Sequence, residues 1–401
     1  MRNPGGQSTS SVCGLGERDA RFEVVVCGGG IAGVEGLLRL RRLGGDRLRL
    51  TLVSPEPDLV YRPLAVWEPF AGSGVLRYPL ERVAADVGAR WVQDRLSSVD
   101  DAKRTVHTEA GATLSYDALL IAIGAQESSP YPYADTFTDR NADETFYGIV
   151  QEIETGNLNS VAFVLPREWV WPLPLYELAL MTAQRARSAN RKPRITFITS
   201  EVRPLQAFGQ AAGEAIVRLL QQAGITLHTG AAARVPSPRV VSFGETQLEA
   251  QRIVTLPKIT GPALPGVPAG TRWFIPINER CVVPSTEGRV FAAGDATDFP
   301  VKQGGIGAQQ ADTSASGIAH IAGLANRPAA LQPVIRGMLL TGDQPLYASA
   351  HVISGLGWRS EIYPHPPWPS EQKIVAEELG PYLHILNDEA PNPVRATNTH
   401  Q

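Results

Sequence analysis

Cysteine is scarce in this chain of 401 residues, which contains only Cys13, Cys27 and Cys281. These three are too far apart to form a C-x-x-C or C-x4-C pair. A disulfide scaffold, a redox-active dithiol and a clustered thiolate metal site all need more cysteines or closer pairs. We therefore expect no metal site. We interpret Cys27, which ends an apolar run, as a small buried core residue.

The sequence also has little net charge and no long apolar run. The formal charge is −3 without a basic cluster, so we expect no nucleic-acid partner. No stretch reaches the roughly 20 apolar residues that a membrane span needs, and residues 1–20 form a polar tail without the apolar core of a signal peptide. We expect a cytoplasmic protein. The amphipathic piece Gln372–Leu379 is short and acidic, so it predicts at most weak peripheral contact with a membrane.

Glycine, in contrast, is concentrated in one informative place. The stretch GGGIAG follows an apolar run, Phe22–Cys27, and precedes a segment of helical spacing, Val34–Leu43, and a second strand-like run, Leu48–Val53. Its glycines form a G-x-G-x-x-G pattern: Gly28, Gly30 and Gly33. In a β-α-β unit these glycines allow a tight turn, close approach of a pyrophosphate to the backbone, and close packing of helix and strand. The stretch therefore predicts a dinucleotide site at the helix N-terminus.

The end of the second predicted strand leaves two possibilities for the ribose of that dinucleotide. Such units carry an acidic residue there, but this chain has Ser54, and Glu56 follows two residues later. Glu56 either reaches the ribose through the turn or is a solvated loop carboxylate. The segment at Arg62 and Pro63 is expected to be extended.

A second α/β unit follows, without a glycine-rich turn. The expected order is strand, helix, strand, helix, strand, which predicts another parallel sheet. The segments are Val161–Leu165, Pro174–Ser188, Arg194–Ser200, Gly213–Ala223 and Ile225–Thr229. The connection PREWVWPLP, residues 166–174, contains no glycine. Its prolines and bulky side chains would keep a pyrophosphate away from the backbone.

The fold class that we predict is α/β, with two Rossmann-like doubly wound domains and a short C-terminal region. The first domain is interrupted by the second. The predicted boundaries are a tail at 1–20, the first domain at 21–130 and 273–330, the second at 145–272, and the C-terminal region at 331–401. Residues 126–146 are interpreted as a loop-like linker.

Three motifs, in this order and spacing, resemble those of the flavoproteins with two dinucleotide-binding domains: GGGIAGVE, YDALLIAIGA and GRVFAAGDA. That superfamily includes pyridine nucleotide-disulfide reductases, type II NADH dehydrogenases and sulfide:quinone oxidoreductases. The segments VYRPLAVWEPF and VKQGGIGAQQAD look like those of its quinone-reducing branch. The resemblance covers residues 22–340.

The resemblance implies FAD as cofactor. It places the glycine turn on the FAD pyrophosphate, Gly124 close to FAD, and Asp295 on the ribityl chain. The helix from Gly304 would point its N-terminus at the flavin, and Lys302 would add a positive charge that favours the reduced anion. Lys302 is otherwise a solvated loop lysine. The residues expected to bind FAD are Gly28, Gly30, Ile31, Ala32, Gly33, Ser54, Glu56, Arg62, Pro63, Ala122, Gly124, Gly294, Asp295, Lys302 and Gly305.

Departures from the family pattern concern the substrates. The missing glycine turn of the second domain makes the usual binding of NADH or NADPH doubtful. Sulfide oxidation in the resembling enzymes uses cysteines beside the flavin, and one of these falls where this chain has Trp171 and Pro172. Trp169, Trp171 and Tyr176 are expected to line a substrate pocket, or else they are core packing.

Glu177 matches a glutamate that opens the second-domain helix in these flavoproteins, and with Lys302 it is our candidate for a catalytic role. A carboxyl partly buried against Trp171 and Tyr176 could have a raised pKa and relay protons to the flavin or a quinone. Alternatively, Glu177 is a first-turn carboxylate that stabilises the helix dipole.

Our leading hypothesis is an FAD-dependent oxidoreductase that transfers two electrons from a small-molecule substrate other than sulfide to a quinone or another acceptor. One alternative is an NAD(P)H dehydrogenase with an atypical nicotinamide site. A second alternative, from another class, is a binding or scaffold protein with structural FAD. The C-terminal region is too short to be the full dimerisation domain of the disulfide reductases.

Overall fold

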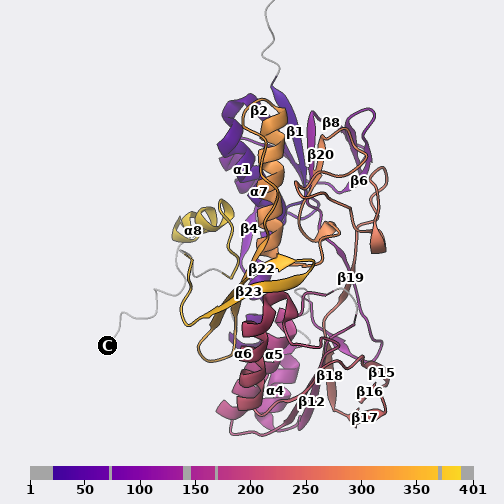
Figure 1. Ribbon diagram of the computed structural model, residues 1–401, viewed down its shortest axis with the longest axis vertical. Coiled ribbons are helices and arrows are strands. Elements are labelled where there is room, and N and C mark those ends of the chain that lie inside the picture. Colours follow the sequence, from indigo (N-terminus) through magenta and orange to yellow (C-terminus); the bar gives the residue numbers. More distant parts are fainter. Residues whose placement is uncertain (1–20, 72–74, 139–145, 168–169, 369–372, 390–401) are drawn as a thin grey trace, which may run out of the picture.

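The computed structural model describes residues 21–71, 75–138, 146–167, 170–368 and 373–389. The molecule is elongated, and two α/β units are stacked along its long axis (Figure 1). C-terminal strands and a helix lie at the level where the two units meet. The predicted α/β class with two Rossmann-like sheets is confirmed.

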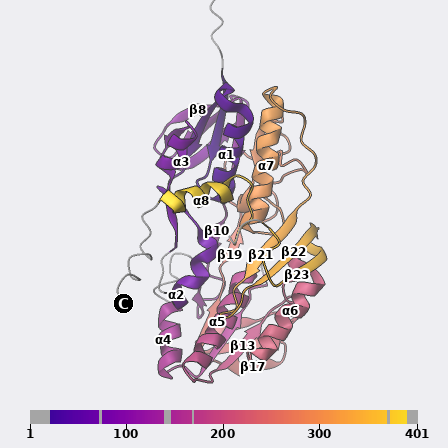
Figure 2. The ribbon, with the colours of Figure 1, turned by 90° about the vertical axis from the view of Figure 1, so that its left-hand side faces the viewer.

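The first unit is built on a five-stranded parallel sheet in the order β20-β9-β1-β2-β5. The helix α7 packs closely along α1 over one face of this sheet (Figure 2). These elements are β1 (Phe22–Cys27), β2 (Leu48–Val53), β5 (Arg90–Val92), β9 (Ala118–Ile121), β20 (Val290–Ala292), α1 (Ile31–Gly44), α3 (Leu80–Asp86) and α7 (Gly304–Ile321). Strands β1 and β9 are almost wholly buried, which fits their continuous apolar sequences. Cys27 is buried there, as expected.

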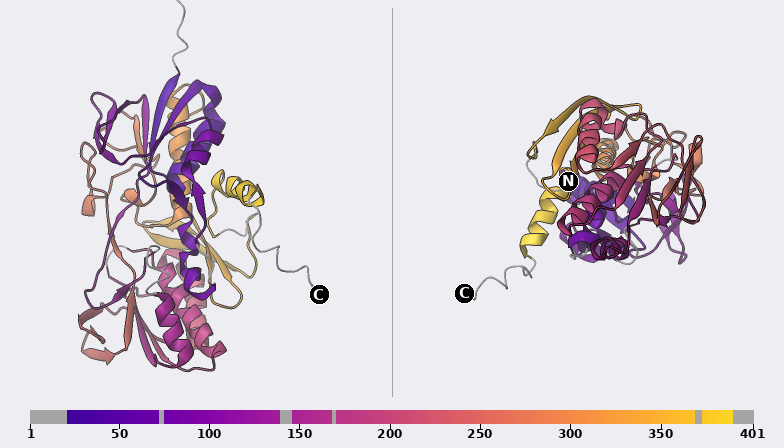
Figure 3. Two further views of the ribbon diagram at one scale, coloured as in Figure 1. Left: turned by 180° about the vertical axis from the view of Figure 1, so that it is seen from behind. Right: turned by 90° about the horizontal axis from the view of Figure 1, so that it is seen from below.

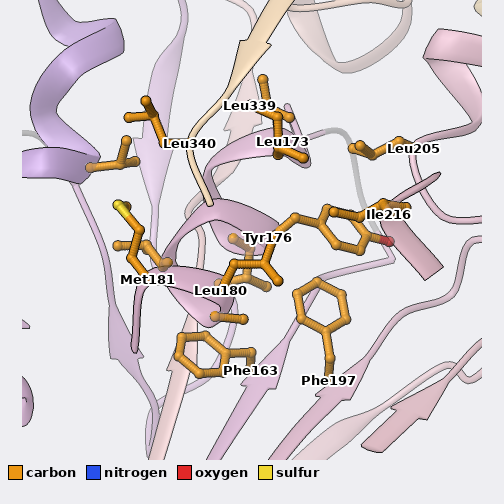
Figure 4. Close-up of a cluster of buried hydrophobic side chains, with 14 of the residues drawn as sticks. Phe163, Leu173, Tyr176, Leu180, Met181, Phe197, Leu205, Ile216, Leu339 and Leu340 are labelled. Carbon is orange, nitrogen blue, oxygen red and sulfur yellow. The ribbon is translucent and has the colours of Figure 1, made fainter. Parts of the chain in front are cut away.

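The second unit has its own parallel sheet in the order β11-β18-β12-β13-β14. Its elements are β11 (Asp135–Thr136), β12 (Ser160–Val164), β13 (Arg194–Ile198), β14 (Thr226–His228), β18 (Arg252–Thr255), α4 (Tyr147–Thr155), α5 (Leu173–Ser188) and α6 (Gly209–Gln222). The apolar side of α5 packs on the sheet, and Leu339 and Leu340 reach the same core (Figure 4). The second unit is therefore packed together with the C-terminal region.

Short antiparallel pieces complete the two units. A three-stranded sheet, β6-β7-β8, belongs to the first unit, and another, β15-β16-β17, belongs to the second. The pairs β3-β4 and β10-β19 are two-stranded. The bounds are β3 (Asp58–Val60), β4 (Arg77–Pro79), β6 (Leu96–Asp100), β7 (Thr105–Thr108), β8 (Thr113–Ser115), β10 (Gln126–Ser128), β15 (Arg234–Ser237), β16 (Val240–Phe243), β17 (Thr246–Glu249) and β19 (Lys258–Thr260). The 3-10 helix η2 (Arg62–Trp67) and α2 (Glu68–Ala71) follow β3.

Two expectations from the sequence are corrected. Residues 126–146 are not simply a linker, because β10 pairs with β19 and β11 extends the second sheet. Arg62 and Pro63, expected to be extended, instead begin the 3-10 helix η2. The helix α8 (Leu379–Glu389) begins at the last residue of the amphipathic piece Gln372–Leu379. A three-stranded antiparallel sheet of β21 (Val334–Leu339), β22 (Leu346–Ile353) and β23 (Leu356–Tyr363) was not anticipated. Its three strands all lie within residues 334–363, in a C-terminal region that contains scattered prolines.

The glycine turn is held by two close backbone approaches. Gly28 has a φ of +122°, and a Cβ there would lie 2.1 Å from the carbonyl oxygen of Ala122. A Cβ on Gly33 would lie 1.9 Å from the carbonyl oxygen of Gly28. Gly30 differs, because nothing lies within 4 Å of its Cβ position and its φ is −82°. Only Gly28 and Gly33 are therefore required for the packing of the protein itself.

We expect Gly33→Ala to lower the free energy of unfolding by about 1–3 kcal/mol, since backbone must move to admit the methyl group. Gly30→Ala is the matched control, and it should leave the stability of the cofactor-free protein within about 0.5 kcal/mol. Denaturant unfolding of both cofactor-free variants tests this. Equal stability of the two variants would contradict the packing role of Gly33.

Candidate active site

A cavity of about 230 Å³ lies where the two units meet the C-terminal region. The first unit contributes Arg62, Pro63, Asp295, Lys302 and Gly304 to its lining. The second unit contributes Val170, Trp171 and Glu177, and the C-terminal region contributes Gly337, Lys373 and Ile374. Charged groups and apolar side chains therefore line one cavity, as in a ligand site.

A buried ion pair forms one side of this cavity. The Lys373 ammonium lies 2.7 Å from Oε2 of Glu177, and the side chains are 6% and 0% exposed. The amide of Leu340 donates to Oε1 of Glu177 at 2.9 Å. Burial raises the pKa of Glu177 and lowers the pKa of Lys373, while each partner opposes the shift of the other. The two pKa values thus approach each other, which suits a pair that passes protons.

Glu177 is not a first-turn residue, because α5 begins at Leu173, and its role as a proton relay stays a prediction. Its side chain is committed to Lys373 and Leu340, from the C-terminal region, and lies at a cavity. A first-turn carboxylate acting on the helix dipole alone would need neither contact.

A second cationic group lies on the first-unit side of the cavity. Lys302 is buried, and its ammonium donates to the carbonyl oxygens of Asp295, at 3.3 Å, and Thr297. It also lies 3.8 Å from the ring centroid of Phe274. Burial lowers its pKa to about 8, against the opposing effect of nearby carboxylates. The pKa of Asp295 is raised by burial, and Lys302 and Arg62 reduce that shift. Lys302 is therefore not a solvated loop lysine.

The glycine turn and the start of α7 fit a dinucleotide. The helix α1 begins at Ile31 and Ala32, so its first amides face the open space over Gly30. Gly124 also has open space at its Cβ position. Gly294, with a φ of +75°, lies against Gly307 of α7, and the Gln310 amide nitrogen is buried without a partner. The cradle and this orphaned donor fit a dinucleotide, and FAD as that dinucleotide stays a prediction.

Other predicted cofactor residues surround the same turn. Ala122 is buried beneath Gly28, and Gly305 lies buried in the first turn of α7. Ser54 is buried next to the turn, whereas Glu56 is exposed on the following loop. A ribose contact by either residue stays a prediction.

The corresponding region of the second unit is closed by its own side chains. The Tyr176 hydroxyl donates to Oε2 of Glu201 at 2.7 Å, and its ring stacks on Phe197 with centroids 4.2 Å apart. Glu201 follows β13, the position where a nucleotide-binding unit would offer a carboxylate to a ribose. Tyr176 is hydrogen-bonded to that carboxylate. It does not line the cavity, which corrects its predicted place in the substrate pocket.

Trp171 is the predicted pocket residue that the structure does place at the cavity. Its ring also packs against Phe208, with centroids 5.6 Å apart. Trp169 lies outside the described residues. Among the described cysteines, Cys27 and Cys281 are buried, and burial raises the pKa of each thiol to about 12. Neither lines the cavity.

Sequence reasoning missed Lys373 and Glu127, which also lines the cavity. Lys373 is a single cation in the acidic segment EQKIVAEE, far in sequence from any motif. The lone basic residue between acids was the only available signal. In the described ranges, no cluster of His, Cys, Asp and Glu is arranged to hold a metal ion. No described helix is long and apolar enough to cross a membrane.

Comparisons with known proteins agree with this geometry. A sequence profile described as pyridine nucleotide-disulphide oxidoreductase matches residues 22–158. The chain is similar to the sulfide-quinone reductase of Aquifex aeolicus (strain VF5), with 28% identity over 303 residues, 69% of each chain. It is also similar to the mitochondrial sulfide:quinone oxidoreductase of Mus musculus, with 32% identity over 110 residues, 26% of this chain and 23% of that protein.

Two solved structures share the fold. The sulfide:quinone oxidoreductase from Aquifex aeolicus superposes with a TM-score of 0.76 at 23% identity, over 85% of this chain and 86% of that chain. A ferredoxin reductase from Rhodopseudomonas palustris gives a TM-score of 0.63 at 18% identity, over 82% and 83%. At these identities the two structures support the fold alone.

The ion pair generates a test of stability against pH. Lys373→Met leaves Glu177 buried without its cation, so we expect a loss of about 3–5 kcal/mol at neutral pH. In the variant, the folded-state pKa of Glu177 lies above its unfolded value. Its protonation supports folding at low pH, and that support is lost as the pH rises through the folded pKa. The cost of Lys373→Met should therefore be smaller at pH 5 than at pH 8 in denaturant unfolding.

The double variant Glu177→Gln/Lys373→Met is the matched control, because it removes both charges together. It should be more stable than Lys373→Met alone. A cost that is the same at both pH values, or simple additivity of the two substitutions, would contradict a buried ion pair.

Proposed function

We propose that the chain is an FAD-dependent oxidoreductase of the sulfide:quinone oxidoreductase-like branch, within the pyridine nucleotide-disulphide oxidoreductase family whose profile matches residues 22–158. It takes two electrons from a small-molecule donor other than sulfide and passes them to a quinone or another acceptor. The observation that carries this proposal is the buried Glu177–Lys373 pair in a cavity that also contains Lys302.

FAD is the cofactor that the first unit suits. Gly28, Gly30 and Gly33 would hold its pyrophosphate at the start of α1, where the backbone leaves space. Asp295 and the N-terminus of α7 would face the flavin end. Bound FAD supplies the two-electron chemistry that these side chains lack. The positive charge of Lys302 and the α7 dipole both favour negative charge on a reduced ring.

Pyridine nucleotide is not the proposed electron donor. The turn before α5 contains no glycine, and Pro172 precedes the helix where a pyrophosphate would need free backbone amides. The hydroxyl of Tyr176 already donates a hydrogen bond to the carboxylate of Glu201. A nucleotide would have to displace this buried contact and still find no phosphate cradle.

A donor other than sulfide is proposed from the position of the thiols. A cysteine route needs a thiolate beside the flavin, and thiolates form poorly where burial raises the pKa. Cys27 and Cys281 lie in the core of the first unit, away from the cavity. Trp171 lies at the cavity where the resemblance would place a cysteine.

Glu177 and Lys373 have a defined part in the reaction of a quinone acceptor. A quinone that gains two electrons also takes up two protons to become a quinol. Glu177 and Lys373 share one proton at the cavity, which the pair can give to the quinone and regain from solvent, while the second proton would accompany the two electrons. Trp171 and Ile374 supply apolar walls beside the pair.

A donor screen tests the function directly. The FAD-loaded protein is mixed anaerobically with NADH, NADPH, sulfide and thiols, and the flavin absorbance near about 450 nm is followed. We expect no rapid bleaching by either pyridine nucleotide or by sulfide. Rapid bleaching by NADH or NADPH would instead establish a dehydrogenase with an atypical nicotinamide site. A flavin that only dithionite reduces, with a protein partner that co-purifies, would favour the scaffold alternative.

The proton donor is tested on the other half of the reaction. Dithionite-reduced protein is mixed with a short-chain ubiquinone, and reoxidation is followed by stopped flow. Glu177→Gln should slow this step by about 100-fold, as is typical for the loss of a general acid. Glu201→Gln is a control, because Glu201 is a buried carboxylate that does not line the cavity. Equal rates for wild type and Glu177→Gln would exclude this role.

The reduction potential tests Lys302. A positive charge beside the flavin stabilises its reduced anion, so Lys302→Met should lower the two-electron potential by about 30 mV, a tenfold change in equilibrium constant. Lys192→Met is the control, since Lys192 is exposed on the second unit. An unchanged potential in Lys302→Met would place its charge away from the flavin.

A further inference from the structure

The segment that carries Lys373 runs from the cavity to the outside of the first unit. Lys373 and Ile374 line the cavity, and α8 begins shortly afterwards at Leu379. The helix α8 lies beside the first unit at the level where the two units meet (Figure 3). The position of Lys373 against Glu177 thus depends on what fixes the chain between the cavity and α8.

Glu35 fixes the α8 end of this segment. It lies on α1, in the helix that follows the glycine turn, and its side chain is completely buried. Its Oε1 accepts the amide of Glu378 at 3.0 Å, and its Oε2 accepts the amide of Leu379 at 2.6 Å. One carboxylate therefore satisfies two amides at the N-terminus of α8, where a negative charge is also favoured by the helix dipole.

Charged groups around Glu35 reinforce this contact. From α1, Arg39 lies 3.0 Å from Glu377 and 2.9 Å from Glu378, and Arg42 lies 2.6 Å from Glu378. Asp312, on α7, is a half-buried carboxylate near Glu35, and its buried Oδ1 has no hydrogen-bond partner. Both arginines come from α1, so the segment is attached mainly to the helix of the glycine turn.

Further contacts hold the two ends of the segment. The amide of Ile374 donates to the Tyr61 hydroxyl at 3.1 Å, next to the cavity. The far part of α8 is held by α3 and β4 through three side-chain contacts: Arg82–Glu389, Tyr382–Asp86 and Tyr78–Asn387. Glu35 is the buried anchor between them, and its loss would leave the stretch after Ile374 held only by Tyr61 at the Lys373 end and by surface ion pairs at the α8 end.

We propose that Glu35 is a positioning residue, which holds Lys373 against Glu177 by capping α8 from the helix of the glycine turn. The dinucleotide-binding helix and the proton-donating pair are thereby joined through one buried carboxylate. The effect on the reaction rests on the proposed function, whereas the effect on the position of Lys373 does not.

The first test measures the position of Lys373 without using catalysis. FAD-loaded protein is treated with acetic anhydride, and acetylation of Lys373 is followed by mass spectrometry, with exposed Lys192 as internal reference. Glu35→Gln keeps the side-chain shape but replaces one acceptor oxygen by a donor. It should acetylate Lys373 at least tenfold faster than wild type, and amides 374–380 should exchange hydrogen faster.

Glu377→Gln is the matched control. It removes a negative charge from the same cluster, but Glu377 is exposed and caps nothing. It should leave the acetylation of Lys373 at the wild-type rate. Glu35→Asp, which retains the charge, should give an intermediate rate and serves if Glu35→Gln folds poorly. Equal acetylation in wild type and both Glu35 variants, or equal effects of Glu35→Gln and Glu377→Gln, would overturn the proposal.

The second test connects the anchor to the reaction. The pH profile of quinone-driven reoxidation is measured in Glu35→Gln, Lys373→Met and the double variant. Glu35→Gln should shift the profile in the direction of Lys373→Met, and the double variant should be no slower than Lys373→Met. Additive effects would overturn the positioning role. If Lys373→Met leaves the profile unchanged while Glu35→Gln exposes Lys373, the proposed function fails and the anchor stands.

Discussion

The Glu177–Lys373 ion pair is the constraint on which the arrangement of this protein depends. Two buried charges are costly unless each has its partner, so the second unit and the C-terminal region must meet at this point. Leu340, which directly follows β21, contributes a third group, because its amide donates to Glu177. The cavity lies where it does because these parts are joined beside it, and a purely apolar contact would not fix the side chains so narrowly.

The two α/β units share a topology but differ in what their turns permit. In the first, Gly28 and Gly33 are needed for packing, and Gly30 leaves open space for a ligand. In the second, the same place in the topology is occupied by proline and aromatic side chains, and Tyr176 occupies Glu201. The same sheet order thus supports a cofactor in one unit and an internally packed wall in the other. This is consistent with function residing in sites rather than in folds.

Local signals in the sequence explain why much of the fold was predictable. The buried strands, the glycine turn and the helix from Gly304 follow from apolar runs and from glycine spacing, and each appears in the structure. The antiparallel sheet of β21, β22 and β23 was not predictable from the sequence, because the scattered prolines and short apolar runs of its region resemble loop sequence. Glu177 could be selected from its place in a motif. Lys373 could not, because its partner is distant in the chain and only the tertiary structure brings them together.

The C-terminal region illustrates how a short segment can complete a site. Lys373 alone would not hold its position, because a long side chain on a segment outside any helix or strand has many conformations. The hydroxyl of Tyr61 fixes the chain on one side, and Glu35 fixes it on the other. Both anchors belong to the first unit, whereas the carboxylate that Lys373 meets belongs to the second. The segment therefore bridges the two units across the cavity. Its order depends on the same helix whose N-terminus would receive the dinucleotide, so the geometry of the proton-donating pair and the binding of the cofactor are linked through α1.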